Sequence, residues 1–237
     1  MPKAVKVLLV VIVLLAGVLI GADRVLAVVA ERKLADQVSA ELQKKGLTTS
    51  QEPQVSIGGF PFLTQMLAGK YSSIQITAPD VTSGNVKFTS LDVRVEGVVA
   101  DDFGLTPVLA EKVTGEGIVP FGSIVALLPR SDVTVIAVGE KLQLRLPLNF
   151  GEQSLVVVAT VMPSISDGRL RLAVDEVGTQ DGGALPAFAQ MLLMPVNALL
   201  SAGFELPKLP YDMRVDRVEV ADTGLRAWAS AADVPLN

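Results

Sequence analysis

The first strong pattern along the chain is an unbroken apolar run over residues 7–22. Lys3 and Lys6 precede this run, and Asp23 and Arg24 close it. A helix over the run is roughly 24 Å long, which approaches the roughly 30 Å of a bilayer's hydrocarbon core. Basic residues before such a helix favour a cytoplasmic N-terminus and an external domain. The pattern therefore predicts a single-pass membrane protein whose main domain is exported.

A cleaved signal peptide is the alternative interpretation of the same segment. Residues 25–27 (Val-Leu-Ala) offer a small-residue cleavage site, but two charged residues separate them from the apolar run. We favour an uncleaved anchor and keep cleavage, with a mature protein that starts near Val28, as the alternative. In both cases residues 1–24 form the anchor or signal segment, and residues 25–237 form one exported domain.

The spacing of apolar positions changes from helical to extended near Gly46. Apolar residues recur every three to five positions over 25–45, which predicts an amphipathic helix that continues from the anchor and ends at a C-cap glycine. Beyond Gly46, apolar and polar residues alternate, most regularly over 142–148, as in strands with one buried face. The expected strands include residues 55–57, 74–76, 91–95, 133–137, 142–148, 156–161, 170–174, 215–220 and 225–229.

Short turns separate several of these strands, for example at residues 139–140 and 167–168. Strands joined by short turns pair as an antiparallel meander. Three segments between the strands predict helices, over residues 62–68, 121–128 and 187–200. The predicted fold class is therefore α+β: a large curved antiparallel β-sheet packed with a few helices and preceded by an N-terminal transmembrane helix.

The charge balance argues against one class of partner. The chain has a net charge of −5, and removing Lys3 and Lys6 leaves −7 for the rest. Phosphate contacts from basic side chains supply most non-specific nucleic-acid affinity, so this acidic domain predicts no nucleic-acid partner. Such a domain would engage a membrane through apolar contacts or a local basic spot.

The residue types that most catalytic and metal sites require are absent. The chain has no cysteine and no histidine, so a thiol nucleophile, a disulfide and a Ser-His-Asp triad are all impossible. It also lacks a phosphate-binding glycine loop and a nucleophile-elbow motif. The carboxylate pairs Asp101-Asp102 and Asp175-Glu176 are typical of solvated turns rather than catalytic dyads. We therefore expect a protein that is not an enzyme and has no catalytic residue, cofactor or metal site.

Two apolar segments are candidate ligand sites. Residues 187–200 have only two polar side chains, and a helix that is apolar all round is either core or faces an apolar ligand. Residues 58–71 turn sharply from a strand into a short helix, with aromatic side chains that the fold, a ligand or a partner must cover. A core position is the alternative for both segments, although a curved sheet closed by helices can enclose an apolar cavity. The candidate contact residues are Phe60, Phe62, Leu63, Phe188, Met191, Leu192 and Met194.

The second of these segments carries a family resemblance. Residues 55–71, VSIGGFPFLTQMLAGKY, and the following strand 74–80, IQITAPD, resemble the LmeA-like phospholipid-binding proteins of actinobacteria. The order of later elements, including residues 206–210 (LPKLP), extends the resemblance over nearly the whole chain. It implies an envelope protein that binds phospholipids, including phosphatidylinositides, and supports lipomannan elongation. It also implies a fold related to tubular lipid-binding domains, but it assigns no individual lipid contact.

Two hypotheses for function follow. The favoured one is a non-enzymatic phospholipid-binding protein of the cell envelope or periplasm, which holds acyl chains in an apolar groove. The alternative is a membrane-anchored interaction protein whose apolar surfaces dock and stabilise an integral-membrane enzyme, such as an envelope glycosyltransferase, without carrying lipid. The two hypotheses share the membrane anchor and differ in whether the domain itself holds lipid.

Overall fold

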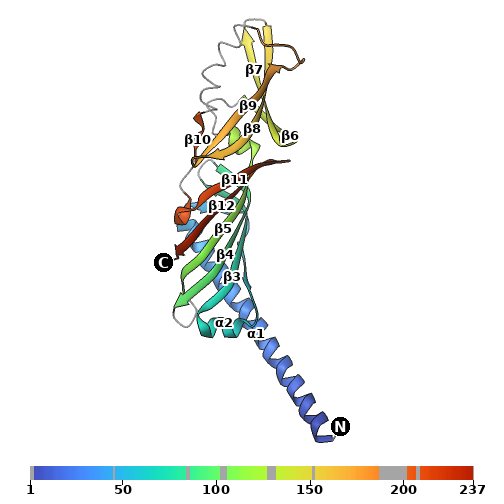
Figure 1. Cartoon of the computed structure of the whole chain (residues 1–237), viewed down its shortest axis with the longest axis vertical. Helices are drawn as coiled ribbons and strands as arrows, with labels where there is room; N and C mark the ends of the chain where they lie inside the picture. The colour runs from blue at the N-terminus through green and yellow to red at the C-terminus, as the bar shows by residue number, and fades with distance from the viewer. Residues whose placement is uncertain are drawn as a thin grey trace.

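The computed structural model shows an elongated molecule in which two antiparallel sheets follow one another along the long axis, with the N-terminal helix projecting from one end (Figure 1). It describes residues 3–44, 46–83, 86–101, 106–126, 132–150, 153–186, 202–206 and 209–236. The predicted α+β class is confirmed, but the strands divide between two sheets instead of forming a single large one.

Helix α1 (Lys3–Lys44) joins the apolar run and the predicted amphipathic helix into one continuous element. The described apolar side chains of its first part are exposed, and by length and composition α1 is able to cross a membrane. Gly46 ends it as expected: its φ is 72°, and its N–H donates to the carbonyl of Gln43 at 3.0 Å. A left-handed φ of this kind favours glycine because it has no Cβ.

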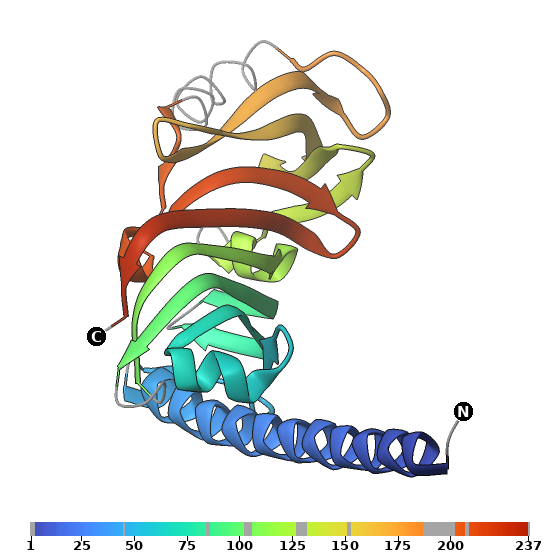
Figure 2. The same cartoon turned by 60° about the horizontal axis from the view of Figure 1, so that its bottom comes forward.

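The larger sheet follows α1 and is curved (Figure 2). Its strand order is β1-β3-β4-β5-β12-β11. Strand β2 also pairs with β3. A short helix, α2 (Phe62–Ala68), connects β2 to β3 and ends at Gly69, as the sequence predicts. The strands are β1 (Leu47–Thr48), β2 (Gln54–Gly58), β3 (Lys70–Ser83), β4 (Val86–Asp101), β5 (Thr106–Pro120), β11 (Arg214–Ala221) and β12 (Gly224–Pro235).

The smaller sheet is inserted between β5 and β11 and has the order β10-β9-β8-β7-β6. Helix α3 (Phe121–Ala126) precedes it, and a short 3-10 helix, η1 (Pro210–Asp212), follows it. The predicted helix over 121–128 therefore begins where expected, whereas the one predicted over 187–200 lies outside the described residues. The strands are β6 (Thr134–Val138), β7 (Lys141–Phe150), β8 (Gln153–Ser166), β9 (Arg169–Thr179) and β10 (Phe204–Glu205).

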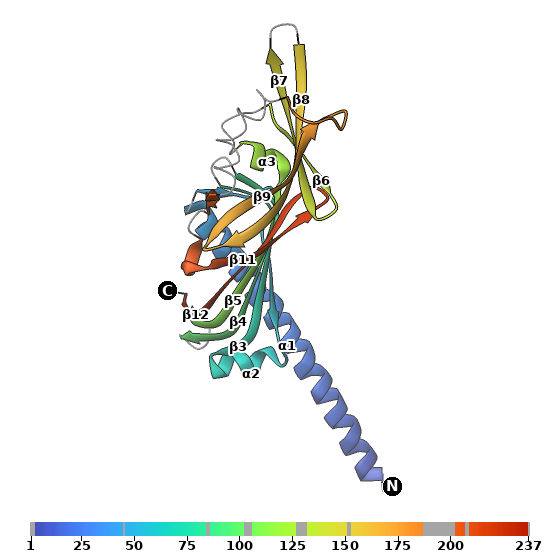
Figure 3. The same cartoon turned by 45° about the horizontal axis from the view of Figure 1, so that its top comes forward.

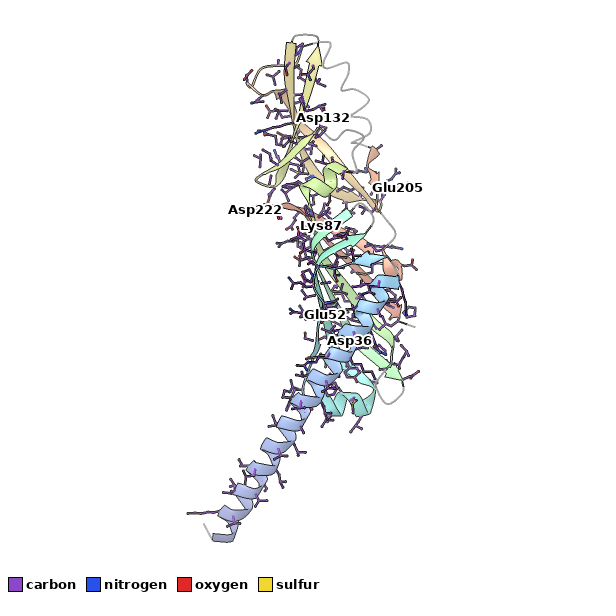
Figure 4. All side chains as sticks on the ribbon, turned by 180° about the vertical axis from the view of Figure 1, so that it is seen from behind. Asp36, Glu52, Lys87, Asp132, Glu205 and Asp222 are labelled. Atoms are coloured by element: carbon purple, nitrogen blue, oxygen red, sulfur yellow. The ribbon has the colours of Figure 1, made fainter. Side chains whose placement is uncertain are left out.

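Helix α1 crosses one face of the larger sheet, which we call the inner face (Figure 4). Ala27, Ala30 and Leu34 of α1 pack there against a buried cluster that includes Ile74 and Val113. A second cluster includes residues of α3 and both sheets, among them Leu142, Val161 and Leu225. We call these the α1 core and the α3 core; the second packs the two sheets against each other.

The inner face departs from simple alternation at one level of the sheet. In β4 the buried residues Val95 and Val98 are three positions apart instead of two, and in β5 Ala110 and Val113 show the same spacing. Val98 pairs with Ala110 and Val95 with Val113, so the irregularity lies side by side in the two strands. Gly97 has a φ of 61° at this point. The left-handed φ of Gly97 marks a local change in the course of β4, and β5 follows it there in unbroken register.

Candidate functional site

A row of apolar residues crosses the inner face between the two cores. Strand pairing aligns Ala78, Leu91, Gly117, Ala227 and Val218 across β3, β4, β5, β12 and β11. We call this set the central row. It contains no polar side chain, and three of its five members are glycine or alanine, which leaves short side chains over the middle strands.

The central row lies between the two cores and belongs to neither. The level on one side of it includes Val93, which packs against the α1 core, and the level on the other includes Leu225 of the α3 core. Leu91, Ala227 and Val218 are themselves half-buried, whereas Ala78 and Gly117 are buried, the latter beneath the side chains of Leu91 and Phe88. Apolar side chains that are set between two cores and not fully covered are suited to contact with an apolar ligand.

The opposite face of the same strands, which we call the outer face, carries polar and charged side chains. Trp228 donates a hydrogen bond to Glu116 at 3.2 Å, and the Arg217 guanidinium stacks over its ring at 3.9 Å from the centroid. Thr77 donates to Asp92 at 2.7 Å on the same face. A shallow hollow of about 220 Å³ lies here, lined largely by polar side chains. These groups already satisfy one another, so this face is poorly suited to acyl chains.

A second hollow, of about 450 Å³, lies between the C-terminal part of α1 and the segment before β2. Asp36 and Glu52 line it from the two sides, and Figure 4 shows both residues in this region. Ser39, Gln43 and residues 49–51 complete most of its lining. Its polar walls make it a poor acyl-chain site as well.

The three candidate residues of the α2 segment have different environments. Phe62 is 2% exposed and belongs to the α1 core, where its ring centroid lies 6.1 Å from that of Tyr71. Phe60 is 61% exposed, and Leu63 is half-buried. Two phenylalanines that look equivalent in sequence therefore differ, because Phe62 faces the sheet and Phe60 faces outward. The other candidates, Phe188, Met191, Leu192 and Met194, lie outside the described residues.

The end of the apolar run contacts this same segment. Asp23 is only 2% exposed, and its Oδ1 accepts the N–H of Leu63 in the first turn of α2 at 2.8 Å. Its Oδ2 accepts from the guanidinium of Arg24, also at 2.8 Å. Asp23 therefore joins α1 to α2 as a carboxylate.

Two further contacts join α1 to this end of the larger sheet. The Arg24 guanidinium lies 5.0 Å from the ring centroid of Phe60. Glu31 accepts the N–H of Ile57 in the edge strand β2 at 2.8 Å. The sequence shows Asp23 and Arg24 only as charges that close the apolar run. Their partners lie about forty residues away, so no local pattern predicts these contacts.

The described residues offer no carboxylate cluster for a metal ion. Among them, no group of three or more Asp and Glu side chains is placed to hold a metal ion. Asp175 lies within β9 instead of in a turn, where it accepts a hydrogen bond from Lys141 at 2.6 Å and raises the pKa of that lysine. Asp101 ends β4, and its neighbour Asp102 is outside the described residues.

The apolar row between the two cores offers a surface suited to an apolar ligand. The comparison with known families gives the ligand class: the chain belongs to the LmeA-like phospholipid-binding family, whose model matches residues 21–230. The resemblance found in the sequence is thereby confirmed. This family is defined by lipid binding and not by an enzymatic activity. No curated protein and no solved structure matches the chain.

Proposed function

We propose that the domain over residues 25–237 binds phospholipid on the outer side of the membrane, with the acyl chains against the central row. The family match over 21–230 carries the phospholipid class. The position of the row supports the placement, because its half-buried apolar side chains belong to neither core. In this arrangement the acyl chains complete a surface that the protein leaves only partly covered.

The lipid class and the cellular role extend this proposal. The resemblance favours phosphatidylinositides among the ligands and a role in lipoglycan assembly, specifically of lipomannan, in an actinobacterial envelope. An envelope glycosyltransferase is then the enzyme that benefits from the bound lipid or from the protein itself. The protein acts in this scheme by binding and presenting lipid, without a chemical step of its own.

The proposal is tested by the lipid content of the full-length protein after purification in a non-phospholipid detergent. Mass spectrometry of organic extracts should find near-stoichiometric phospholipid, or uptake to that level from added vesicles. Burial of acyl chains releases about 0.8 kcal/mol per methylene, so a bound lipid should survive washing that removes annular lipid. A membrane protein with one transmembrane helix and an unrelated external domain serves as the control. Protein that contains no phospholipid and takes up none from vesicles would favour the docking hypothesis.

We also propose that α1 is retained as an anchor, with Met1 in the cytoplasm and Asn237 outside. Cleavage near Val28 would remove Asp23 and Ala27, which are 2% and 5% exposed because they pack into the domain. It would also remove the acceptor for the Leu63 N–H. A signal peptide that is removed cannot contribute to the core of the mature protein, whereas these residues do pack into the domain.

Intact-mass measurement of protein extracted from membranes should therefore find residues 3–27 present. A reporter that is active only outside the cytoplasm should work when fused after Asn237. A mature chain that begins near Val28 would contradict the retained anchor, and a reporter that works only in the cytoplasm would contradict the topology.

A further inference from the structure

The α2 end of the domain exposes apolar side chains that no described element covers. Phe60 is 61% exposed and Leu67 is 78% exposed, the highest exposure among the described large apolar side chains outside α1. We propose that Phe60 and Leu67, with Arg24 beside Phe60, form a membrane foot that inserts into the headgroup region of the bilayer that holds α1. This inference rests on the proposed retention of α1 but not on the proposed lipid site.

The height of the foot follows from its bond to α1. Residue 22 is the last of the apolar run, and Asp23 accepts the N–H of Leu63 at 2.8 Å. A helix rises about 1.5 Å per residue, so α2 begins within about one residue of the level at which α1 leaves the hydrocarbon core. Arg24, at 5.0 Å from the Phe60 ring, fixes the same level for Phe60. The exposed ring of Phe60 thus lies at the level of the membrane surface, and Leu67 follows one helical turn after Leu63 in α2.

The charges of the segment that carries the foot fit the headgroup region of a membrane, although Asp101 of β4 lies close to the end of α2, because its neighbour Ala100 donates a hydrogen bond to Gly69. Residues 53–79 contain no Asp or Glu, although the chain as a whole has 25 such residues, and they contain one basic residue, Lys70. Asp23, the nearby carboxylate of α1, is buried and already paired with Arg24. Aromatic and basic side chains are favoured at the membrane interface, where rings meet the acyl boundary and cations meet phosphates. An acidic domain that approaches an anionic surface does so best through such a segment.

The contacts that hold the foot also set the orientation of the domain. The smaller sheet, with the β7–β8 hairpin, lies at the end of the molecule away from α2 (Figure 3). With α2 at the membrane surface, that hairpin points away from the bilayer. The foot, the α1 core and the central row then follow one another outward from the membrane.

The absence of cysteine allows a direct test by single-cysteine labelling of the full-length protein. Phe60→Cys and Leu67→Cys are labelled with an environment-sensitive fluorophore and reconstituted in vesicles of phosphatidylcholine and phosphatidylglycerol. Val18→Cys, in the apolar run, is the buried-in-lipid control. Val138→Cys and Met162→Cys, which are 49% and 45% exposed in the smaller sheet, are the water-facing controls. All five positions carry apolar side chains that the protein leaves exposed.

Probes at Phe60 and Leu67 should shift to shorter emission wavelengths in vesicles. Lipids with a spin label high on the acyl chain should quench them several-fold more than the probes at Val138 and Met162. Water-like emission and equally weak quenching of the probes at all four positions would overturn the foot. The exposed apolar surface would then be a contact for a protein partner that the vesicles lack. The labelled protein is full-length and keeps α1, and its lipid content is measured separately by mass spectrometry. Failure of the foot is therefore distinguishable from failure of the proposed lipid site.

Discussion

Replacement of Phe62 by alanine is expected to lower the free energy of unfolding by about 3–5 kcal/mol, the usual cost of removing a buried aromatic side chain. Phe62 is 2% exposed and packs against Tyr71 in the α1 core. The cavity would open between α2 and the sheet, where the backbone has little room to collapse because Asp23 and Gly69 fix both ends of α2. Denaturant unfolding of detergent-solubilised full-length protein measures the loss.

Phe60→Ala is the matched control, two positions earlier in the same segment. It removes an exposed ring and its contact with Arg24, and an exposed cation–π contact contributes about 0.5–1 kcal/mol. The two variants should therefore differ by at least about 2 kcal/mol in stability. Equal losses would show that Phe62 is not part of a packed core.

Replacement of Ala227 by phenylalanine is expected to abolish most phospholipid loading. Ala227 lies in the central row on β12, half-buried between the two cores. A phenyl ring there would occupy the space that the proposal assigns to acyl chains, whereas the outer face and both cores would be unchanged. Lipid per protein, measured by mass spectrometry of extracts, should fall several-fold, with little change in Tm.

Ala232→Phe is the control on the same strand, because Ala232 is exposed. It should load lipid as the unmodified protein does. If the central row were sealed core instead, Ala227→Phe would overpack it at a cost of about 1–3 kcal/mol, and Tm would fall. Unchanged lipid loading in Ala227→Phe would place the lipid elsewhere.

Much of the fold could be predicted because it depends on the local spacing of apolar residues and on turn residues. The helix to Gly46, the hairpins near residues 139–140 and 167–168, and helix α2 all follow from spacing and turn residues. Strand β5 was not predicted: its buried residues Ala110 and Val113 are three positions apart, and glycines occupy the next inner-face positions. Neither feature resembles the alternation of a regular strand.

The candidate site was less predictable because it depends on long-range pairing. Leu91, Ala227 and Val218 come from strands far apart in the chain, and only the register of the sheet aligns them. Alternation shows which residues face inward, but it does not show where one core ends and another begins. The difference between Phe60 and Phe62 likewise depends on how α2 docks on the sheet.

The continuity of α1 limits how the domain can move. A domain on a flexible linker samples a volume that grows with linker length. Here one helix runs from Lys3 to Lys44 without interruption, and Asp23 and Glu31 bond it to the domain. With α1 retained as proposed, the protein in a bilayer would diffuse laterally, spin and tilt as one rigid body. If the proposed lipid site exchanges its ligand, a lipid donor or acceptor would meet it at a set height above the membrane, and two-dimensional encounter within that plane would govern the rate of exchange.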